Sequence, residues 1–218
     1  NSLSHAPSAK AFDSINSDLM NIYYSQQLGD GWFLKTAKCS HSEGPVVVKI
    51  FSKEHLDGDS RDTDNLLQAH TKKLQEIRYR LTHSLNNCPF QRFIEGNDRI
   101  YLIRQYFYNN LRDRVETRPC LTQTEKIWIT FLLLKALDEC HSNDICHGDL
   151  KLENVMLTSW NWVYLTDYAC YKPTCISSEI PHSFSYYFDT HRSRSCYLAP
   201  ERFKGTSEIT GDEQLTPE

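Results

Sequence analysis

The feature that most constrains this chain is the octapeptide from His147 to Asn154, which follows a long apolar segment. It places Asp149 two residues before Lys151 and five residues before Asn154. An aspartate can orient an attacking hydroxyl, a lysine can neutralise a phosphoryl group, and an asparagine oxygen can bind magnesium. The spacing therefore predicts phosphoryl transfer, with a polar loop after a buried helix as the alternative.

Two further groups extend this chemistry. Asp167 follows Asn154 by thirteen residues and would complete a magnesium site, because hard cations prefer oxygen ligands. Lys49 ends an apolar strand and could pair with nucleotide phosphates. Glu76, on the next helix, is the expected partner of Lys49, and an ion pair with Arg80 one turn later is its alternative.

Composition excludes several classes of protein. The 218 residues are 39% hydrophobic, which is enough to bury a core, and the net charge of −4 does not favour a nucleic-acid partner. No stretch of eighteen apolar residues predicts a membrane-spanning helix. The eight cysteines form no CxxC pair, so we expect reduced thiols in a cytosolic protein rather than a metal or disulfide framework.

Periodicity predicts an α+β fold, with strands and one helix preceding a mostly helical part. The expected strands are residues 23–28, 33–39, 46–51, 100–107, 155–157 and 163–166, and the first helix spans residues 66–85. Thr122 and Glu125 form a capping box that begins a second helix, which is apolar on most sides and expected to be largely buried.

The expected organisation has two lobes between two flexible ends. Residues 1–20 lack periodicity and predict a flexible tail, residues 21–107 a small mainly-β lobe, and residues 108–204 a mainly-α lobe. Residues 205–218 predict a second flexible tail.

Ala199-Pro200-Glu201 follows Asp167 by thirty-two residues, and the ordered set from Tyr23 to Phe203 resembles a eukaryotic protein kinase domain. This resemblance implies a two-lobed fold whose mainly-α lobe is truncated, with part of its apolar surface uncovered. It also implies binding of ATP and Mg²⁺. It implies that Asp149 is the catalytic base with Lys151 beside it, and that Asn154 and Asp167 bind the metal. The nucleotide-binding residues that it implies are Leu28, Gly29, Gly31, Lys49, Glu76 and the hinge from Gln105 to Phe107.

Several positions depart from the kinase pattern. Leu34 stands in place of the third loop glycine, and Gly148 replaces the arginine that normally pairs with a phosphorylated activation segment. Tyr168-Ala169 replaces Phe-Gly, and Arg104 lies where an apolar residue is usual, so that it could capture Glu76. We therefore expect metal and nucleotide binding without fast phosphoryl transfer.

A narrower resemblance rests on segments 109–114, 158–162, 188–190 and 195–203, in which Trp160 and Trp162 are expected to pack a hairpin. With His147-Gly148-Asp149, these segments resemble kinase-like regulatory subunits of the class III phosphatidylinositol 3-kinase complex. The resemblance implies a serine/threonine kinase-like domain that holds the lipid kinase and a beclin-like subunit on endosomal or autophagosomal membranes from the cytoplasm. It also implies N-myristoylation, if Met-Gly precedes Asn1.

Two other functions remain open. A fully active serine/threonine protein kinase is one, because Lys49, Asp149, Lys151, Asn154 and Asp167 are all present. A small-molecule phosphotransferase is the other, since such enzymes share the His-Gly-Asp pattern. Lys151 and the Ala-Pro-Glu motif argue against the second.

Overall fold

The computed structural model describes residues 9–31, 33–52, 60–96, 99–188, 196–210 and 215–216. The chain divides into two compact units. The first, here the sheet unit, contains residues 1–65 and 91–106, and the second, the helical unit, contains residues 66–90 and 107–218. The predicted α+β fold is confirmed, although most of the first long helix groups with the helical unit rather than with the sheet.

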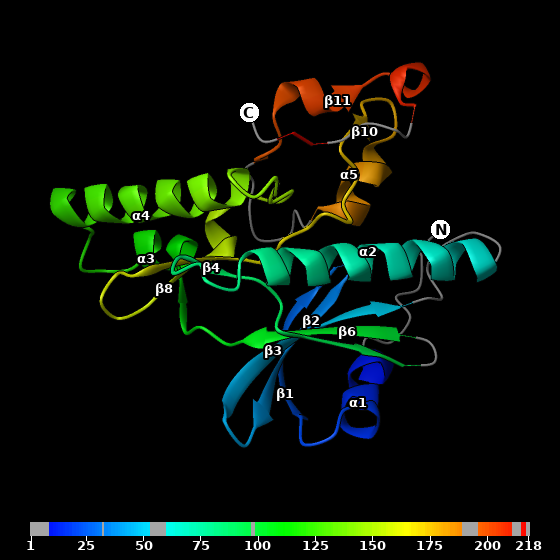
Figure 1. Cartoon of the computed structure of the whole chain (residues 1–218), viewed down its shortest axis with the longest axis horizontal. Coiled ribbons are helices and arrows are strands. Elements are labelled where there is room, and N and C mark those ends of the chain that lie inside the picture. The colour runs from blue at the N-terminus through cyan, green and yellow to red at the C-terminus, as the bar shows by residue number, and fades with distance from the viewer. Residues whose placement is uncertain are drawn as a thin grey trace. The chain divides into compact units, whose positions relative to one another are not determined.

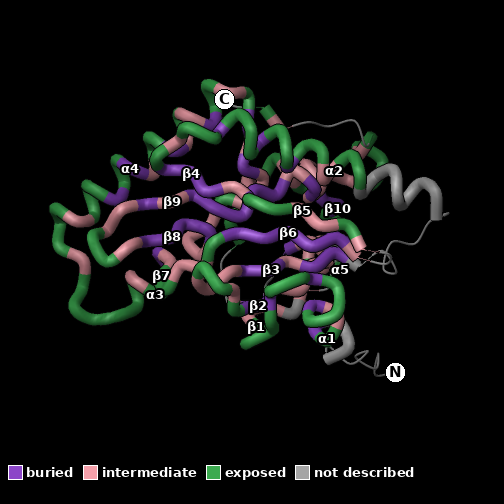
Figure 2. Tube along the Cα trace, turned by 60° about the horizontal axis from the view of Figure 1, so that its bottom comes forward, coloured by how far each residue is buried: buried purple, intermediate pink, exposed green. Residues whose placement is uncertain are grey.

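The sheet unit is built on five antiparallel strands in the order β1-β2-β3-β6-β5 (Figure 1). Their bounds are β1 (Tyr23–Asp30), β2 (Lys35–His41), β3 (Gly44–Ser52), β5 (Arg92–Glu95) and β6 (Arg99–Gln105). Strands β3 and β6 are rich in valine, isoleucine, leucine and aromatic residues, which suit a pleated and mostly buried surface. Figure 2 shows buried positions along both.

Helix α1 (Ala9–Asp18) packs against this sheet, where the sequence predicted a flexible tail. Phe12, Ile15 and Leu19 recur at helical spacing and are at most 4% exposed. Tyr101 of β6 fixes the helix further, because its hydroxyl donates to Asp18 Oδ2 at 2.6 Å. Burial and the neighbouring Asp18 carboxylate raise the pKa of Tyr101. The correction has a simple cause: a short polar helix carries its signal in three apolar residues only.

The helical unit surrounds a four-stranded sheet in the order β4-β9-β8-β7. The strands are β4 (Asn87–Cys88), β7 (Asn109–Asn110), β8 (Val155–Leu157) and β9 (Val163–Thr166). The helices are α2 (Ser60–Arg80, of which residues 66–80 belong here), α3 (Leu111–Glu116), α4 (Gln123–His141) and α5 (Pro181–Tyr187). Shorter elements complete the unit: the 3₁₀ turns η2 (Leu152–Asn154), η3 (Pro200–Arg202) and η4 (Thr206–Glu208), and the parallel pair β10 (Ile176–Ser177) and β11 (Phe203–Lys204).

The capping box of α4 is confirmed, but the expected burial of this helix is wrong. Thr122 and Glu125 satisfy each other's backbone N–H groups at 2.8 and 3.2 Å. Only one face of the helix is buried in the described structure, and Figure 2 shows exposed positions along the other. The exposed apolar residues are Ile127, Trp128, Phe131 and Leu134. This agrees with the expectation of uncovered apolar surface on the helical lobe.

The two tryptophans of the β8–β9 hairpin differ in role. Trp162 donates its indole N–H to the Leu85 carbonyl at 3.1 Å and packs edge-on against Trp128. Trp160 is 87% exposed, so the expectation that it packs the hairpin is wrong. Trp160 lies in the turn between the two strands.

Part of the second predicted tail is also structured. The Thr206 hydroxyl donates to Glu179 Oε2 at 2.7 Å and lies 2.8 Å from the Ser177 hydroxyl. The expected flexibility is therefore wrong for the residues around η4. All eight cysteines are free. No helix of the described ranges combines the length and apolarity needed to cross a bilayer.

Replacing Ile15 by alanine tests whether α1 is part of the core. Ile15 is fully buried, so Ile15→Ala should lower the free energy of unfolding by about 2–5 kcal/mol. Urea denaturation measures the change, and Asp13→Ala on the exposed face of α1 is the matched control. Equal stability of the two variants would show that the helix is dispensable.

Candidate functional site

The loop after α4 is organised around His147, which is 5% exposed. Its Nε2 lies 2.7 Å from the Thr166 carbonyl, and its Nδ1 accepts from the Asp149 backbone N–H at 3.2 Å. Burial lowers the pKa of His147, so the ring is neutral at neutral pH with its proton on Nε2. The backbone N–H of Ala169 donates to the His147 carbonyl at 2.8 Å. One residue thus joins the Asp149 loop to both sides of Asp167.

Asp149 is held by charge. Its Oδ2 lies 2.7 Å from Lys172 Nζ and 3.3 Å from Lys151 Nζ. Burial alone would raise the pKa of this carboxyl group, but the two ammonium groups outweigh it and lower the pKa to about 2. The predicted neighbours Asp149 and Lys151 are therefore in contact, and Asp149 is a carboxylate at neutral pH.

Asn154 and Asp167 lie at the same end of the β8–β9 hairpin. Val155 pairs with Leu165, so the residues flanking this pair, Asn154 and Thr166, face each other. The Thr166 hydroxyl donates to the Asn154 carbonyl at 3.1 Å, and Asp167 follows directly. The register of the two short strands therefore places the predicted metal ligands Asn154 and Asp167 one residue apart across the end of the hairpin.

The donor atoms fit a hard divalent cation. The Asn154 amide donates through Nδ2 to the Asp149 carbonyl at 2.7 Å, which leaves Oδ1 as the amide atom able to bind a metal. Asp167 is 5% exposed and adopts a left-handed backbone with φ of 64°. Over the described residues, no three His, Cys, Asp or Glu side chains form a metal-binding group. The oxygen set of Asn154 and Asp167 suits Mg²⁺, which usually keeps several waters.

Gly148 has a structural reason to replace arginine. Its φ is 81°, and a Cβ at this position would lie 2.6 Å from the carbonyl oxygen of Ala169. The close approach accompanies the hydrogen bond from Ala169 to His147. A side chain at residue 148 is therefore incompatible with this arrangement of the loop.

Tyr168 is anchored by a buried polar network that the sequence did not predict. The ring is fully buried, and its hydroxyl donates to Asn87 Oδ1 at 2.5 Å and contacts Cys140 Sγ at 3.3 Å. The Asn87 amide in turn donates to the Ala136 carbonyl at 3.0 Å and to Ser84 Oγ at 2.8 Å. The available signal was an asparagine at the start of a short apolar segment, which does not reveal its distant partner.

Two of the nucleotide-binding residues expected in the sheet unit, Gly29 and Lys49, lie in one row across the strands. Gly29 of β1 pairs with Thr36 of β2, which pairs with Lys49 of β3. Adjacent strands are about 4.8 Å apart, so Gly29 and Lys49 are separated by roughly 10 Å. Leu28 precedes Gly29 and is half-buried. A Cβ on Gly31 would lie 2.9 Å from the Leu34 carbonyl oxygen, so the turn itself requires this glycine.

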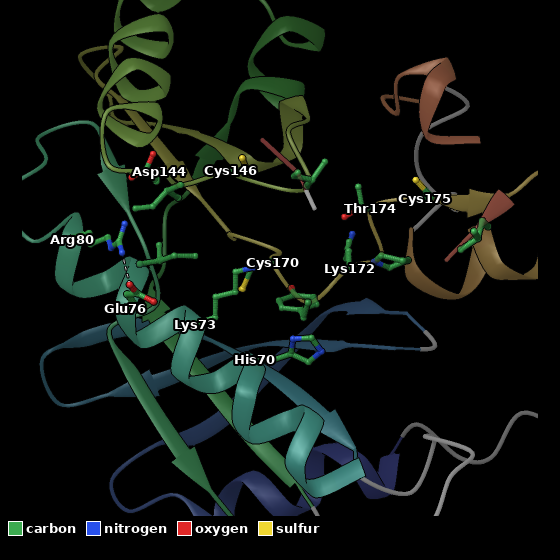
Figure 3. A pocket seen from close by; sticks show the side chains of 16 residues that line it. His70, Lys73, Glu76, Arg80, Asp144, Cys146, Cys170, Lys172, Thr174 and Cys175 are labelled. Atoms are coloured by element: carbon green, nitrogen blue, oxygen red, sulfur yellow. Dashed lines mark hydrogen bonds and ion pairs between the residues drawn. The ribbon is translucent and has the colours of Figure 1, made fainter. Parts of the chain in front are cut away.

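Glu76 pairs with Arg80 at 2.5 Å, the alternative that the sequence had left open (Figure 3). Arg80 also donates to the Asn143 carbonyl at 2.8 Å, which ties α2 to the end of α4. Arg104 is buried and donates to the adjacent Gln105 carbonyl. The pairings of Glu76 with Lys49 or with Arg104 stay predictions.

The expected hinge contains the boundary of the two units, between Tyr106 and Phe107. Gln105 ends β6, and the Tyr106 N–H donates to the Pro45 carbonyl at 3.1 Å. Phe107 packs against Tyr164 with a centroid distance of 5.2 Å.

Two cavities lie within the helical unit. One of about 300 Å³ adjoins Asp149 and Lys151 and is also lined by aromatic residues, among them Phe184, Phe188 and Tyr197. A larger one, of about 470 Å³, is lined by α2 and by the segment after Asp167 (Figure 3). Of these two cavities, the smaller is the one lined by Asp149.

Comparison with known proteins gives a consistent result. The family described as "Protein kinase domain" matches residues 23–213. Serine/threonine-protein kinase VPS15 of Arabidopsis thaliana is 47% identical over 200 residues, which is 90% of this chain and 13% of that protein. The probable serine/threonine-protein kinase vps15 of Dictyostelium discoideum is 48% identical over 200 residues, 90% of this chain and 10% of that protein. Serine/threonine-protein kinase VPS15 of Saccharomyces cerevisiae is 41% identical over 199 residues, which is 91% of this chain and 13% of that protein.

Gly148→Ala tests the close approach in the loop after α4. The left-handed φ and the contact with the Ala169 carbonyl should together lower the free energy of unfolding by about 2 kcal/mol or more. Chemical denaturation measures this loss. Gly205→Ala is the control in the same unit, because a Cβ there meets only ordinary contacts beyond 3.5 Å. A Gly148 variant as stable as the Gly205 variant would contradict the assignment.

Proposed function

Because the chain belongs to the protein kinase family, we propose that it binds ATP with Mg²⁺ and acts mainly as a regulatory kinase-like domain with weak or absent phosphotransfer. The observation that carries the proposal is the register of β8 and β9, which places Thr166, the residue before Asp167, opposite Asn154, whose amide donates to the Asp149 carbonyl. The chain spans 10–13% of the length of the three relatives named above, so the activity and partners of the whole protein are part of the proposal.

Each residue has a defined chemical task in this proposal. Lys49 contacts the nucleotide phosphates, and Asn154 and Asp167 hold Mg²⁺, which when bound neutralises phosphate charge. Lys151 lies close enough to Asp149 to neutralise a phosphoryl group that approaches the carboxylate. Asp149 orients the acceptor hydroxyl. Leu28, Gly29, Gly31 and the hinge from Gln105 to Phe107 cover and read the nucleotide.

The contacts of Asp149 support weak phosphotransfer. Two ammonium groups and the Asn154 amide surround its Oδ2, and a carboxylate with a pKa of about 2 is a poor proton acceptor. Leu34 and Ala169, in place of two family glycines, also favour a regulatory role. A fully active serine/threonine kinase is the second candidate, because Asp149, Lys151 and the metal-binding residues are all present.

The proposed setting follows the narrower resemblance of the sequence. We infer that the chain is part of a regulatory subunit of a class III phosphatidylinositol 3-kinase complex, in contact with the lipid kinase and a beclin-like subunit on endosomal or autophagosomal membranes. The high identity to the VPS15 relatives supports this inference. The N-myristoyl anchor stays a prediction, which the intact mass of the native N-terminus tests.

Asp167→Ala in the full-length subunit tests the metal and nucleotide site. Removing one of two protein ligands should lower Mg²⁺-dependent ATP affinity at least about tenfold, by analogy with losses of metal ligation. Isothermal titration with and without Mg²⁺ measures it, and Asp138→Ala on the exposed side of α4 is the control. Unchanged Mg²⁺ dependence in a folded Asp167 variant would refute the proposed site.

Asp149→Ala separates the two candidate functions. A regulatory domain should keep its assembly with the lipid kinase and the beclin-like subunit when Asp149 is lost, because assembly then depends on the folded site and not on phosphotransfer. Co-purification of the complex measures assembly. Loss of assembly that a phosphomimetic substitution restores would favour the active kinase instead.

A further inference from the structure

The segment that follows Asp167 is called the activation segment here, and the loop from His147 to Asn154 the catalytic loop. Lys172 of the activation segment contacts Asp149 of the catalytic loop. The Lys172 ammonium lies 2.7 Å from Asp149 Oδ2, and the lysine side chain is only 7% exposed. Lys151, which the family pattern places beside this aspartate, is farther away at 3.3 Å and more exposed at 20%. The shortest ion pair of the catalytic aspartate therefore comes from the activation segment and not from the catalytic loop.

A second contact holds Lys172 in place within the same segment. Its ammonium lies 4.4 Å from the centroid of the Phe188 ring, a cation–π distance. Phe188 is 6% exposed and stacks on Phe184 of α5. Lys172 thus joins Asp149 to the aromatic residues at the far end of the described part of the segment.

Arg202 fastens the segment from the other side. Its guanidinium donates to the carbonyls of Thr174 at 2.7 Å and Pro173 at 2.9 Å, and it lies 5.7 Å from the Phe188 ring. Strand β10, just beyond Thr174, pairs in parallel with β11, which begins directly after Arg202. The backbone just after Lys172 is therefore held by the Arg202 side chain.

The polarity of this link is opposite to the one that the family pattern leads one to expect. In the usual arrangement the catalytic loop provides a cation, the arginine before the aspartate, and the segment provides an anion, a phosphate. Here Gly148 provides no cation, and its backbone leaves no room for one. Instead, the segment provides the cation, Lys172, and the loop provides the anion, Asp149.

We propose that Lys172 is a positioning residue that orders the activation segment against the catalytic loop through Asp149, so that the segment is folded without phosphorylation. The inference rests on the proposed function in that Asp149 is taken as the catalytic aspartate. Removing one partner of a buried ion pair destabilises the folded protein, because the remaining charge is left poorly solvated. The order of the segment should therefore require Lys172 and stay unchanged on treatment with phosphatase.

The link also leaves one oxygen of Asp149 available for chemistry. Among the described residues, the side-chain contacts of this carboxylate all fall on Oδ2. Oδ1 is then the oxygen that can orient an acceptor hydroxyl in the adjoining cavity. Lys172 binds Oδ2 and leaves Oδ1 to the cavity side.

Hydrogen exchange on the full-length subunit in its complex tests the proposal. Peptides that cover residues 170–188 should exchange at the same rate before and after phosphatase treatment. Lys172→Met should speed their exchange about tenfold or more, the scale expected for loss of a partly buried charge pair. Lys172→Arg should preserve protection, because a guanidinium keeps the ion pair and the contact with Phe188. Lys135→Met, on the exposed face of α4, is the control.

Asp149→Asn completes a double-mutant cycle. If Lys172 acts through Asp149, exchange in Lys172→Met/Asp149→Asn should be no faster than in Lys172→Met alone. Amine acylation of Lys172, measured by mass spectrometry, should also rise in Asp149→Asn and stay unchanged for Lys135. This second readout decides the matter even if Lys172→Met fails to fold, which faster exchange throughout α4 would reveal.

Two results would overturn the link: phosphatase alone releasing the segment, or Lys172→Met exchanging like Lys135→Met. ATP titration of the same wild-type samples separates this inference from the proposed function. Absent nucleotide binding with intact segment protection would refute the function and leave the link standing. Normal nucleotide binding, together with segment protection that Lys172→Met does not change, would refute the link and leave the proposed function supported.

Discussion

The neutral, buried imidazole of His147 is the contact on which the whole site depends. Through its ring it binds the backbone on one side of Asp167, and through its carbonyl it binds the backbone on the other. It also accepts from the N–H of Asp149. One side chain thus sets the separation between the aspartate proposed for catalysis and the aspartate proposed for the metal. A charged imidazole could not accept at Nδ1, so burial, by keeping the ring neutral, is part of the architecture.

The departures from the kinase pattern are consistent with one another. Gly148 makes room for the carbonyl of Ala169, and the N–H of Ala169 donates to the His147 carbonyl. The hydroxyl that distinguishes Tyr168 from phenylalanine is bound to Asn87, and such a buried hydrogen bond contributes on the order of 1 kcal/mol. With no arginine at residue 148, Lys172 meets Asp149 directly. These substitutions describe a different packing of the same loop rather than a loss of structure, which fits a domain whose folded form is its main contribution.

Prediction from sequence succeeded where a local pattern carries the information. The capping box at Thr122 and the short strands 155–157 and 163–166 were placed correctly, because caps and apolar alternation act within a few residues. Helix α1 was missed because it is stabilised by contacts with the sheet, including Tyr101, which lies far from it in the sequence. The burial of α4 was overestimated, since composition shows that a helix is apolar but not which faces another element will cover.

The sequence by itself determined which chemical groups the chain owns and their order: the aspartates, the asparagine and the lysines at spacings typical of phosphoryl transfer. Only the tertiary structure decided which lysine forms the shortest ion pair with Asp149 and which acidic residue pairs with Arg80. The reason is physical. Spacing along a strand or a helix fixes neighbours within one element, whereas ion pairs between elements depend on backbone positions set by strand register and by contacts such as those of His147.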